Sequence, residues 1–580
     1  MKTVYLYQTD ELLFNPGKGM VLYNTHDENT LSARAKKDYK RALAYASCLN
    51  IKISWIKLQP EREDSYEWSG IDDILSLAKQ LGKRVTLGIG CVVGTGGVQE
   101  GIRSLVPNWV YEAGAKYEDI DCANYKLGGS NISRIPVWED AIYRQKYEKL
   151  ISAVASRYDG NPLIDCVINF SHGNWGEWHY LDINGLPCSK ENLYLERDNK
   201  ARGLEFYRYF VDLFPRYFKK TPLVLPTNIH DSTDELEPWV KYAVDTYSYG
   251  LKREGLITIP NCTQKMWYVS GKGPAFGEWQ SAYYHYKTDG RWSDELLDRQ
   301  IIDGALTHYN LGYYGIGALT YVKEKEHQVR YWANRLGYLF KVVSISLPEN
   351  GEKYASICIR NDGVSRIYLP NSVYLARVDK EGNILEERKI DVDLREIQPH
   401  LQKNFTFLYP FERIEGLCIA MVDNYSGKNI QIQNLKSSKK DYYLLESNGY
   451  YRVCFDHVPI HMSQVKNEYY GIEFVDSAWR TVLCRDKYLS CLYADNYQND
   501  YTAEIKLKDG NVLTSFTAYG IGRIVIKDEN GNCYRVKITE KPKRYFTGFS
   551  KPSGSVKIQI ISDASCWAVK FVDFVYKIDN

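Results

Sequence analysis

The chain has 580 residues, with 74 basic and 72 acidic side chains and a formal net charge of +2. This length predicts about three or four domains. The balance of charge argues against a nucleic acid or a membrane surface as a partner held by bulk charge. The 13 cysteines show no C-x-x-C spacing. The sequence therefore supports neither a zinc ribbon nor a thioredoxin-like motif, and the scattered cysteines are typical of buried side chains in a reducing compartment.

The N-terminal segment, MKTVYLYQTDELLF, has no apolar run before Asp10 and Glu11. It does not have the pattern of a secretory signal. No stretch approaches the roughly 20 apolar residues that a membrane span needs. We therefore expect a cytoplasmic protein, unless a leader has been trimmed.

Short runs rich in β-branched residues alternate with helical patterns through the first 340 residues. The expected strands cover residues 19–23, 51–58, 84–91, 163–171, 222–227, 246–254, 274–279 and 311–319. The expected helices cover residues 69–82, 138–158, 193–214, 235–244, 293–309 and 327–340. In the first of these helices Ser69 and Asp72 fit a capping box, and Gly82 is a natural stop.

About eight strand–helix units predict a sheet of parallel strands. Eight units in this length fit a (β/α)8 barrel, which takes roughly 250 residues or more. The alternative is an open doubly wound sheet, but its G-x-G-x-x-G fingerprint fails in GIGCVVGTGG, where Val93 replaces the last glycine. We therefore predict an α/β protein in which residues 1–340 form a TIM barrel that is the catalytic domain.

Two Gly-Glu-Trp tripeptides occur, at residues 176–178 and 277–279. By the strand count, Glu177 follows strand four and Glu278 lies near the end of strand seven, so the two should face each other across the mouth of the barrel. Active sites of this fold lie at the carboxyl ends of the strands. Two carboxylates across a cleft are the arrangement that cleavage of a glycosidic bond needs. The flanking tryptophans offer apolar faces on which sugar rings can stack.

Four stretches of the chain together resemble a known group of proteins. They are FNPGKGMVLYN (14–24), residues 53–89, SHGNWGEWH (171–179) and GPAFGEW (273–279). Over roughly residues 10–435 the chain resembles bacterial glycoside hydrolases that carry a C-terminal domain of unknown function 4832 and are distantly similar to family 42 β-galactosidases. The resemblance implies a clan A barrel with Glu177 as acid/base and Glu278 as nucleophile. Enzymes of this clan usually have Asn-Glu at the end of strand four, where this chain has Gly-Glu.

Further side chains near these motifs are candidates for sugar contacts, with core packing as the alternative. The candidates are His172, Asn174, Trp175, Trp178, His179, Trp55, Asn228, Arg253 and Trp279. The two histidines flank Glu177 with H-x-x-x-x-E-x-H spacing, which matches no zinc motif, so we predict no metal. Arg253 could instead form a structural ion pair.

Beyond residue 340 the pattern changes to period-two alternation with turn signals and no long helix. This pattern predicts two antiparallel β-sandwiches, residues 341–436 and 437–580, with a linker at 434–442. Residues 555–576 resemble the closing strands of jelly-roll carbohydrate-binding modules. The last domain is therefore either a glycan-binding module or a structural sandwich that packs on the barrel.

The sequence thus predicts a glycoside hydrolase that acts on an oligosaccharide or glycoside, with a retaining mechanism favoured and no cofactor. A homo-oligomer is compatible with barrels of this type. Two alternatives remain open. One is a catalytically inactive glycan-binding protein with the same barrel, and the other is a polysaccharide lyase or related enzyme with a Tyr or His base.

Overall fold

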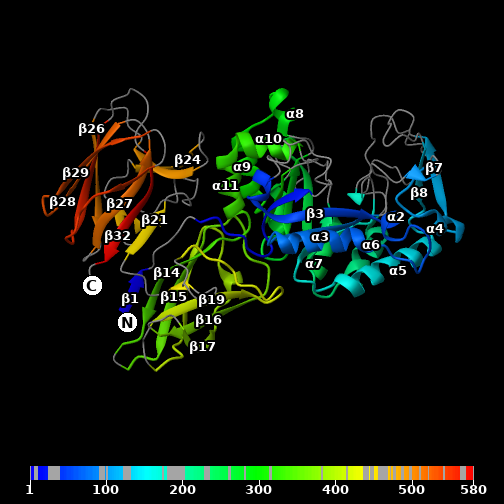
Figure 1. Ribbon diagram of the computed structural model, residues 1–580, viewed down its shortest axis with the longest axis horizontal. Helices are drawn as coiled ribbons and strands as arrows, with labels where there is room; N and C mark the ends of the chain where they lie inside the picture. The colour runs from blue at the N-terminus through cyan, green and yellow to red at the C-terminus, as the bar shows by residue number, and fades with distance from the viewer. Residues whose placement is uncertain are drawn as a thin grey trace.

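The chain is described here from a computed structural model, drawn in Figure 1. It describes residues 2–5, 11–23, 40–90, 98–99, 102–121, 132–172, 176–178, 203–226, 236–258, 263–279, 283–311, 316–349, 351–379, 383–412, 416–434, 443–444, 450–454, 468–469, 472–474, 479–484, 489–494, 500–507, 511–519, 522–539, 543–561 and 570–578.

Eight parallel strands close into a barrel, in which each strand pairs with the next along the chain and the last pairs with the first. They are β2 (Gly19–Tyr23), β3 (Ala46–Ser54), β4 (Arg84–Gly90), β9 (Ile164–Phe170), β10 (Leu223–Pro226), β11 (Gly250–Leu256), β12 (Ala275–Trp279) and β13 (His308–Asn310). The predicted (β/α)8 barrel is confirmed, and the doubly wound alternative is wrong because β13 pairs with β2.

Helices accompany the barrel strands (Figure 1). They are α2 (Trp55–Leu58), α3 (Ser69–Gln80), α4 (Asn108–Glu112), α5 (Ala141–Tyr158), α6 (Gly203–Tyr217), α7 (Pro238–Tyr247), η5 (Gln264–Val269), α8 (Tyr283–Thr288), α9 (Asp294–Asp303), α10 (Ile316–Glu324) and α11 (Glu326–Arg335). A small sheet between β4 and α5 contains β5 (Val98–Gln99), β6 (Ile102–Arg103), β7 (Tyr117–Asp121) and β8 (Ile132–Pro136). None of the helices in these segments is long and apolar enough to cross a membrane.

Local hydrogen bonds explain where several helices begin. Asp140 caps α5, since its carboxylate accepts from the backbone N–H groups of Ile142 at 3.0 Å and Tyr143 at 2.9 Å. The predicted capping box of α3 is wrong, because Ser69 already lies inside the helix and Trp68 is the N-cap residue, without a side-chain hydrogen bond.

Several predicted elements have the wrong bounds. The sixth strand begins at Gly250 and not at residue 246, because α7 extends to Tyr247, and the predicted helix 293–309 ends at Asp303, before β13. The second strand ends at Ser54, because Trp55 starts α2 and its indole donates to Gln59 at 2.7 Å, one helical turn on. The eighth strand is β13, three residues that pair with β12 and β2, and the predicted strand 311–319 is wrong because α10 begins at Ile316. The apolar run after Asn310 contributes a helix to the barrel wall instead of a strand.

The described residues of the first β-region, 340–434 with 443–444, lie mainly in two antiparallel sheets. One sheet is β1 (Lys2–Tyr5), β14 (Phe340–Leu347), β15 (Tyr354–Asn361) and β18 (Gln402–Leu408). The other is β17 (Ile384–Ile390), β16 (Asn371–Val378), β19 (Leu417–Asp423) and β20 (Tyr443–Leu444), with η6 (Leu394–Glu396) after β17. Buried side chains of both sheets belong to one core cluster. The N-terminal strand β1 thus pairs with this region, although residues 1–340 were predicted as the barrel domain.

The second β-region, residues 450–578, also contains antiparallel sheets. One holds β21 (Tyr450–Cys454), β24 (Trp479–Cys484), β25 (Leu489–Ala494), β27 (Asn511–Tyr519), β30 (Lys543–Phe546) and β32 (Lys570–Ile578). The other holds β22 (Glu468–Tyr469), β23 (Ile472–Phe474), β26 (Asp500–Leu507), β28 (Gly522–Asp528), β29 (Cys533–Ile538) and β31 (Ser555–Ile561). The antiparallel character of both regions is confirmed, while the domain boundaries and the packing of the sheets as sandwiches stay predictions.

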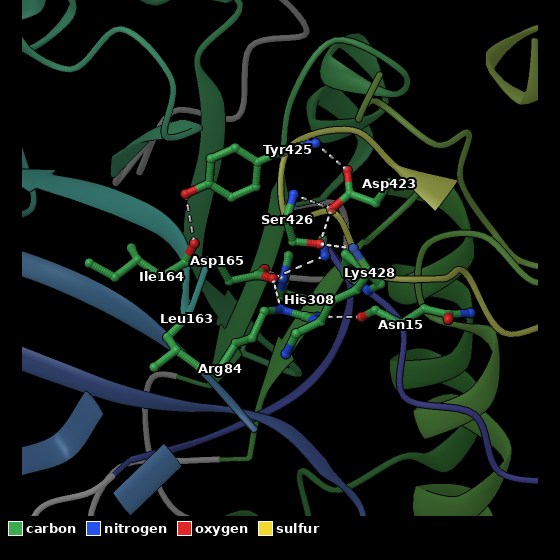
Figure 2. Close-up of polar contacts among 12 residues, drawn as sticks. Asn15, Arg84, Leu163, Ile164, Asp165, His308, Asp423, Tyr425, Ser426 and Lys428 are labelled. Atoms are coloured by element: carbon green, nitrogen blue, oxygen red, sulfur yellow. Dashed lines mark hydrogen bonds and ion pairs between the residues drawn. The ribbon is translucent and has the colours of Figure 1, made fainter. Parts of the chain in front are cut away.

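A buried polar cluster lies at the amino-terminal end of the barrel (Figure 2). Asp165, near the start of β9, forms an ion pair with Arg84 of β4 and a hydrogen bond, at 2.8 Å, with Nε2 of His308 of β13. The backbone N–H of Gly17 donates to the same carboxylate at 3.0 Å. Burial alone would raise the pKa of Asp165, but Arg84 and His308 hold it well below its usual range.

The first β-region covers this end of the barrel. The hydroxyl of Tyr425 donates to the carbonyl oxygen of Ile164 at 2.9 Å, as Figure 2 shows. Asp423 holds the turn that presents Tyr425 by accepting its backbone N–H at 3.1 Å. Asn15, just before β2, exchanges two hydrogen bonds with the backbone of Gln431, at 2.8 and 2.7 Å. The carboxyl ends of the strands, where active sites of this fold lie, are at the opposite end.

Candidate active site

Glu177 lies on a tight turn directly after β9, the fourth strand of the barrel. Gly176, at φ 74°, makes the turn possible, since a Cβ there would lie 2.2 Å from the carbonyl oxygen of Phe170. Glu177 forms a parallel bridge with His172, and the backbone N–H of Trp178 donates to the carbonyl of His172 at 2.9 Å. The Gly-Glu-Trp tripeptide is therefore a compact turn that fixes the direction of the glutamate.

Two described residues near Glu177, His172 and Trp178, are packing residues. His172 is fully buried, with its ring centroid 4.7 Å from that of Trp138 and 5.2 Å from that of Phe210. Trp178 is also buried and stacks on Trp239, with centroids 5.1 Å apart. The predicted sugar contacts of His172 and Trp178 are thus corrected to core packing, because buried rings present no face to a ligand.

Glu278 lies inside β12, the seventh strand of the barrel, and is buried. Its neighbour Gly277 leaves room for the core, since a Cβ there would lie 2.5 Å from a methyl group of Leu306. Trp279 is fully buried, with its ring 4.9 Å from that of Tyr321. Trp279 therefore also packs in the core and does not offer its face to a sugar, contrary to the prediction.

The remaining described candidates are Trp55 and Arg253. Trp55 is fully buried against Tyr147, with centroids 5.6 Å apart, so its predicted sugar contact is corrected to packing as well. Arg253 is buried in β11, and its role in substrate binding stays a prediction. Four other candidates lie outside the described residues, namely Asn174, Trp175, His179 and Asn228.

Lys252 connects the two glutamates. This lysine lies in β11, the sixth strand, and its Nζ is 3.3 Å from Oε1 of Glu177 and forms a closer ion pair with Oε2 of Glu278. The side chains of Lys252 and Glu278 are 3% and 4% exposed, whereas that of Glu177 is 15% exposed. A single ammonium group therefore joins carboxylates that come from the fourth and seventh strands.

Asn310 adds a second contact to Glu278. It ends β13, the eighth strand, and its side-chain Nδ2 donates to Oε1 of Glu278 at 3.1 Å. Each oxygen of Glu278 thus has a nitrogen donor, one from Asn310 and one from Lys252. Sequence reasoning missed both donors. The incorrect bounds of strand eight hid Asn310, and Lys252 was passed over in favour of the arginine next to it.

The ring of Phe170 lies beside this group. Nζ of Lys52 in β3 is 4.0 Å from the ring centroid, and Nζ of Lys252 is 5.8 Å from it. Gly88 of β4 provides the space, because a Cβ there would lie 2.5 Å from the Phe170 ring. The carboxyl end of the barrel therefore combines an apolar ring with two ammonium groups, of which only that of Lys252 belongs to a buried side chain.

Cys48, Asp165 and His308 offer ligand atoms within 4.8 Å of one another, which is the spacing of a possible metal site. Burial raises the pKa of the Cys48 thiol far above its usual range, so a ligand role would require the thiol to lose its proton in a buried place. Both oxygens of Asp165 already bind His308, Arg84 or a backbone N–H. The hydrogen bonds and the fixed charge of Arg84 satisfy this cluster without an ion.

Comparison with known families finds a match to the glycoside hydrolase family 42 β-galactosidase model over residues 26–168. The matched part runs from the segment after β2 into β9 and ends before Glu177. No curated protein matches the chain. The match to a family of glycoside hydrolases gives the enzyme class: the chain is a glycoside hydrolase that acts on O-glycosyl bonds.

Among solved structures, the catalytic domain of β-amylase from Paenibacillus polymyxa is 9% identical, covers 53% of this chain and 94% of its own, and has a TM-score of 0.36. Exo-β-1,4-mannosidase Op5Man5 from Opitutaceae bacterium strain TAV5 is 9% identical over 53% of each chain, with a TM-score of 0.31. Xylanase 10B from Thermotoga maritima is 10% identical, covers 51% of this chain and 82% of its own, and has a TM-score of 0.30. At these scores the structures carry no argument about the substrate of this chain.

Proposed function

We propose that the protein hydrolyses glycosides with retention of configuration, with Glu278 as the nucleophile and Glu177 as the general acid and base. The observation that supports this proposal is the contact of Lys252 with both carboxylates at the carboxyl end of the barrel. It brings together two acidic groups from opposite parts of the strand order, as glycosidic cleavage requires.

The shared nitrogen also limits the distance between the carboxylates. Two oxygens within ordinary ion-pair reach of one nitrogen are at most about 6 Å apart. Retaining glycosidases separate their carboxylates by about 5–5.5 Å, and inverting ones by about 6.5–9.5 Å to make room for a water molecule. The contact with Lys252 therefore favours the retaining geometry.

The surroundings of the two glutamates support different roles. Glu278 lies in a strand, is buried, and has a nitrogen donor for each oxygen, so it is held as a fixed carboxylate suited to nucleophilic attack. Glu177 lies on a turn, is more exposed, and has the longer contact with Lys252. A carboxyl group that alternates between protonated and ionised forms needs such a weaker hold, because the protonated form no longer attracts an ammonium group.

The proposed reaction has two steps. In the first, Glu278 forms a bond to the anomeric carbon while the bond from that carbon to the leaving oxygen breaks, and Glu177 gives its proton to that oxygen. In the second, Glu177 takes a proton from a water molecule, and the oxygen of that water displaces Glu278 from the anomeric carbon. The proton and both carboxyl groups are then restored.

Replacing each glutamate tests the proposal. Glu278→Gln should abolish turnover even of activated aryl glycosides, because no nucleophile remains. Glu177→Gln should keep the first step for aryl glycosides whose leaving group needs no proton. Azide should partly restore Glu278→Gly and yield a glycosyl azide of inverted configuration. The measurement is the release of the aryl group across a panel of sugars, with product analysis by NMR.

Two outcomes would contradict the proposal. Equal losses in both variants without azide rescue, together with lowered melting temperatures, would mean that the glutamates are structural. A wild-type protein whose melting temperature rises with sugar but which releases no aryl group would be a glycan-binding protein instead.

A further inference from the structure

Lys252 is unusual because it is a buried cation between two carboxylates that come from other elements. Its side chain is 3% exposed, and burial of an ammonium group is costly unless the group is paired. The charged groups that face it from the described neighbouring elements are Glu278 of β12 and Glu177 on the turn after β9. Lys52 of β3 lies near the same Phe170 ring that Lys252 approaches.

Without Lys252, Glu177 and Glu278 would lose the ammonium group that both carboxylates contact. Two carboxylates within reach of one nitrogen, in a poorly solvated place, repel each other. The ammonium group of Lys252 offsets this repulsion through contacts with both of them. Its removal would leave two acidic groups that no longer have a common partner to hold them together.

The geometry points to Lys252 as the positioning residue of the acidic pair: its ammonium group sets the separation of Glu278 and the ionised form of Glu177. This inference rests on the proposed function, in which the separation of the carboxylates decides the reaction. Lys252 reaches from the sixth strand to the seventh strand and to the turn after the fourth, so one side chain fixes groups that the backbone holds independently. A misplacement of about 1 Å at such a site can cost roughly 100-fold in rate.

The first test compares Lys252→Met, which keeps the length of the side chain and removes its charge, with Lys252→Arg, which keeps the charge. At a temperature where all variants are folded, Lys252→Met should lose about 100-fold in kcat, with a much smaller change in KM, because the substrate still binds but meets a misplaced pair. Lys252→Arg should melt close to the wild type, and its kcat should lie between those of the wild type and Lys252→Met. Lys52→Met, which removes an exposed lysine near the same ring, is the control for melting.

The second test does not need turnover. A double-mutant cycle combines Lys252→Met with Glu278→Gln and follows thermal melting. Lys252→Met alone should lower the melting temperature by several degrees, and adding Glu278→Gln should restore part of the loss, because the repulsion between the two carboxylates is then removed. The cycle can be measured even if wild-type protein releases no aryl group, so failure of the proposed function and failure of this inference are separate results.

Three results would overturn the inference. One is Lys252→Met with a kcat within twofold of the wild type. Another is a cycle in which the two substitutions lower the melting temperature additively, since the ammonium and the carboxylate would then act independently. The third is a Lys252→Arg variant that loses as much kcat and melting temperature as Lys252→Met. A positive charge at this position would then not be what positions the two carboxylates. If Lys252→Met does not fold, the Lys252→Arg and double-variant results decide.

Discussion

Both ends of the barrel bury an ion pair, but the number of carboxylates that meet the cation differs between them. At the amino-terminal end Arg84 meets one carboxylate, that of Asp165, and Tyr425 of the first β-region lies over the cluster. At the carboxyl end Lys252 meets two carboxylates, and one of them is partly exposed. A buried ion pair that is balanced and covered leaves no charged group free for chemistry, and removing one partner of such a pair destabilises the fold. One with a surplus carboxylate and access to solvent keeps a group available for chemistry.

The largest expected effect on stability comes from breaking the balanced end. Asp165→Asn leaves the guanidinium of Arg84 buried without its carboxylate, and breaking a buried pair in this way costs about 3–5 kcal/mol. Urea unfolding should show this loss in the free energy of unfolding. The matched control is Asp245→Asn, which breaks the exposed pair with Lys272 at 3.2 Å and should cost less than about 1 kcal/mol. Equal losses in the two variants would refute the distinction between the two kinds of pair.

Acid should act on the buried carboxylates that pair with cations. The pKa of Asp165 is well below its usual range. In the first β-region, burial alone would raise the pKa of Asp362, but ion pairs with Arg360 and Lys341 lower it to about 2. A carboxyl group whose pKa is depressed by folding stabilises the fold above its unfolded pKa of about 4, and this contribution disappears as the pH falls towards the folded value. The melting temperature should therefore drop steeply below about pH 4.

The Asp165→Asn variant provides the control for this pH dependence. It has already lost the contribution of that carboxylate, so its melting temperature should fall less between pH 4 and pH 2 than that of the wild type. Parallel curves for the two proteins would show that Asp165 does not contribute to the acid sensitivity.

The smallest expected effect is at the contact that covers the balanced end. Tyr425→Phe removes the hydroxyl that donates to the carbonyl of Ile164 and should cost about 1 kcal/mol, the net value of one hydrogen bond. Turnover should not change, because the site lies at the other end of the barrel. A Tyr425→Phe variant that loses as much activity as Glu278→Gln would mean that the site lies at the amino-terminal end of the barrel. A lower melting temperature with unchanged kcat supports the comparison.

Sequence reasoning predicted the barrel because strands and helices alternate with clear periods over most of its length. It failed at the eighth strand, since His308–Asn310 is too short to show a period and the apolar run after it forms part of α10. Strand counting still put Glu177 after the fourth strand and Glu278 in the seventh, because that error lies after both residues in the chain.

The contacts of the candidate site were harder to predict than its place. Trp55, Trp178, Trp279 and His172 were assigned to sugar binding, and all four are buried. A sequence motif gives the residue type but not the direction in which the side chain points. Lys252 was missed for a related reason: a lysine within a predicted strand gives no signal that it will turn inward, and only the closed barrel brings it between two acidic groups.

The most direct test of the account is covalent trapping of the nucleophile. An activated 2-deoxy-2-fluoro glycoside of the sugar that the wild-type protein turns over best slows the second step more than the first, so a glycosyl-enzyme accumulates. Mass spectrometry of the intact protein and of its peptides should find one sugar attached, on Glu278, in the wild type and none in Glu278→Gln. Turnover without any adduct and with inversion at the anomeric carbon, or an adduct on a residue other than Glu278, would contradict the account.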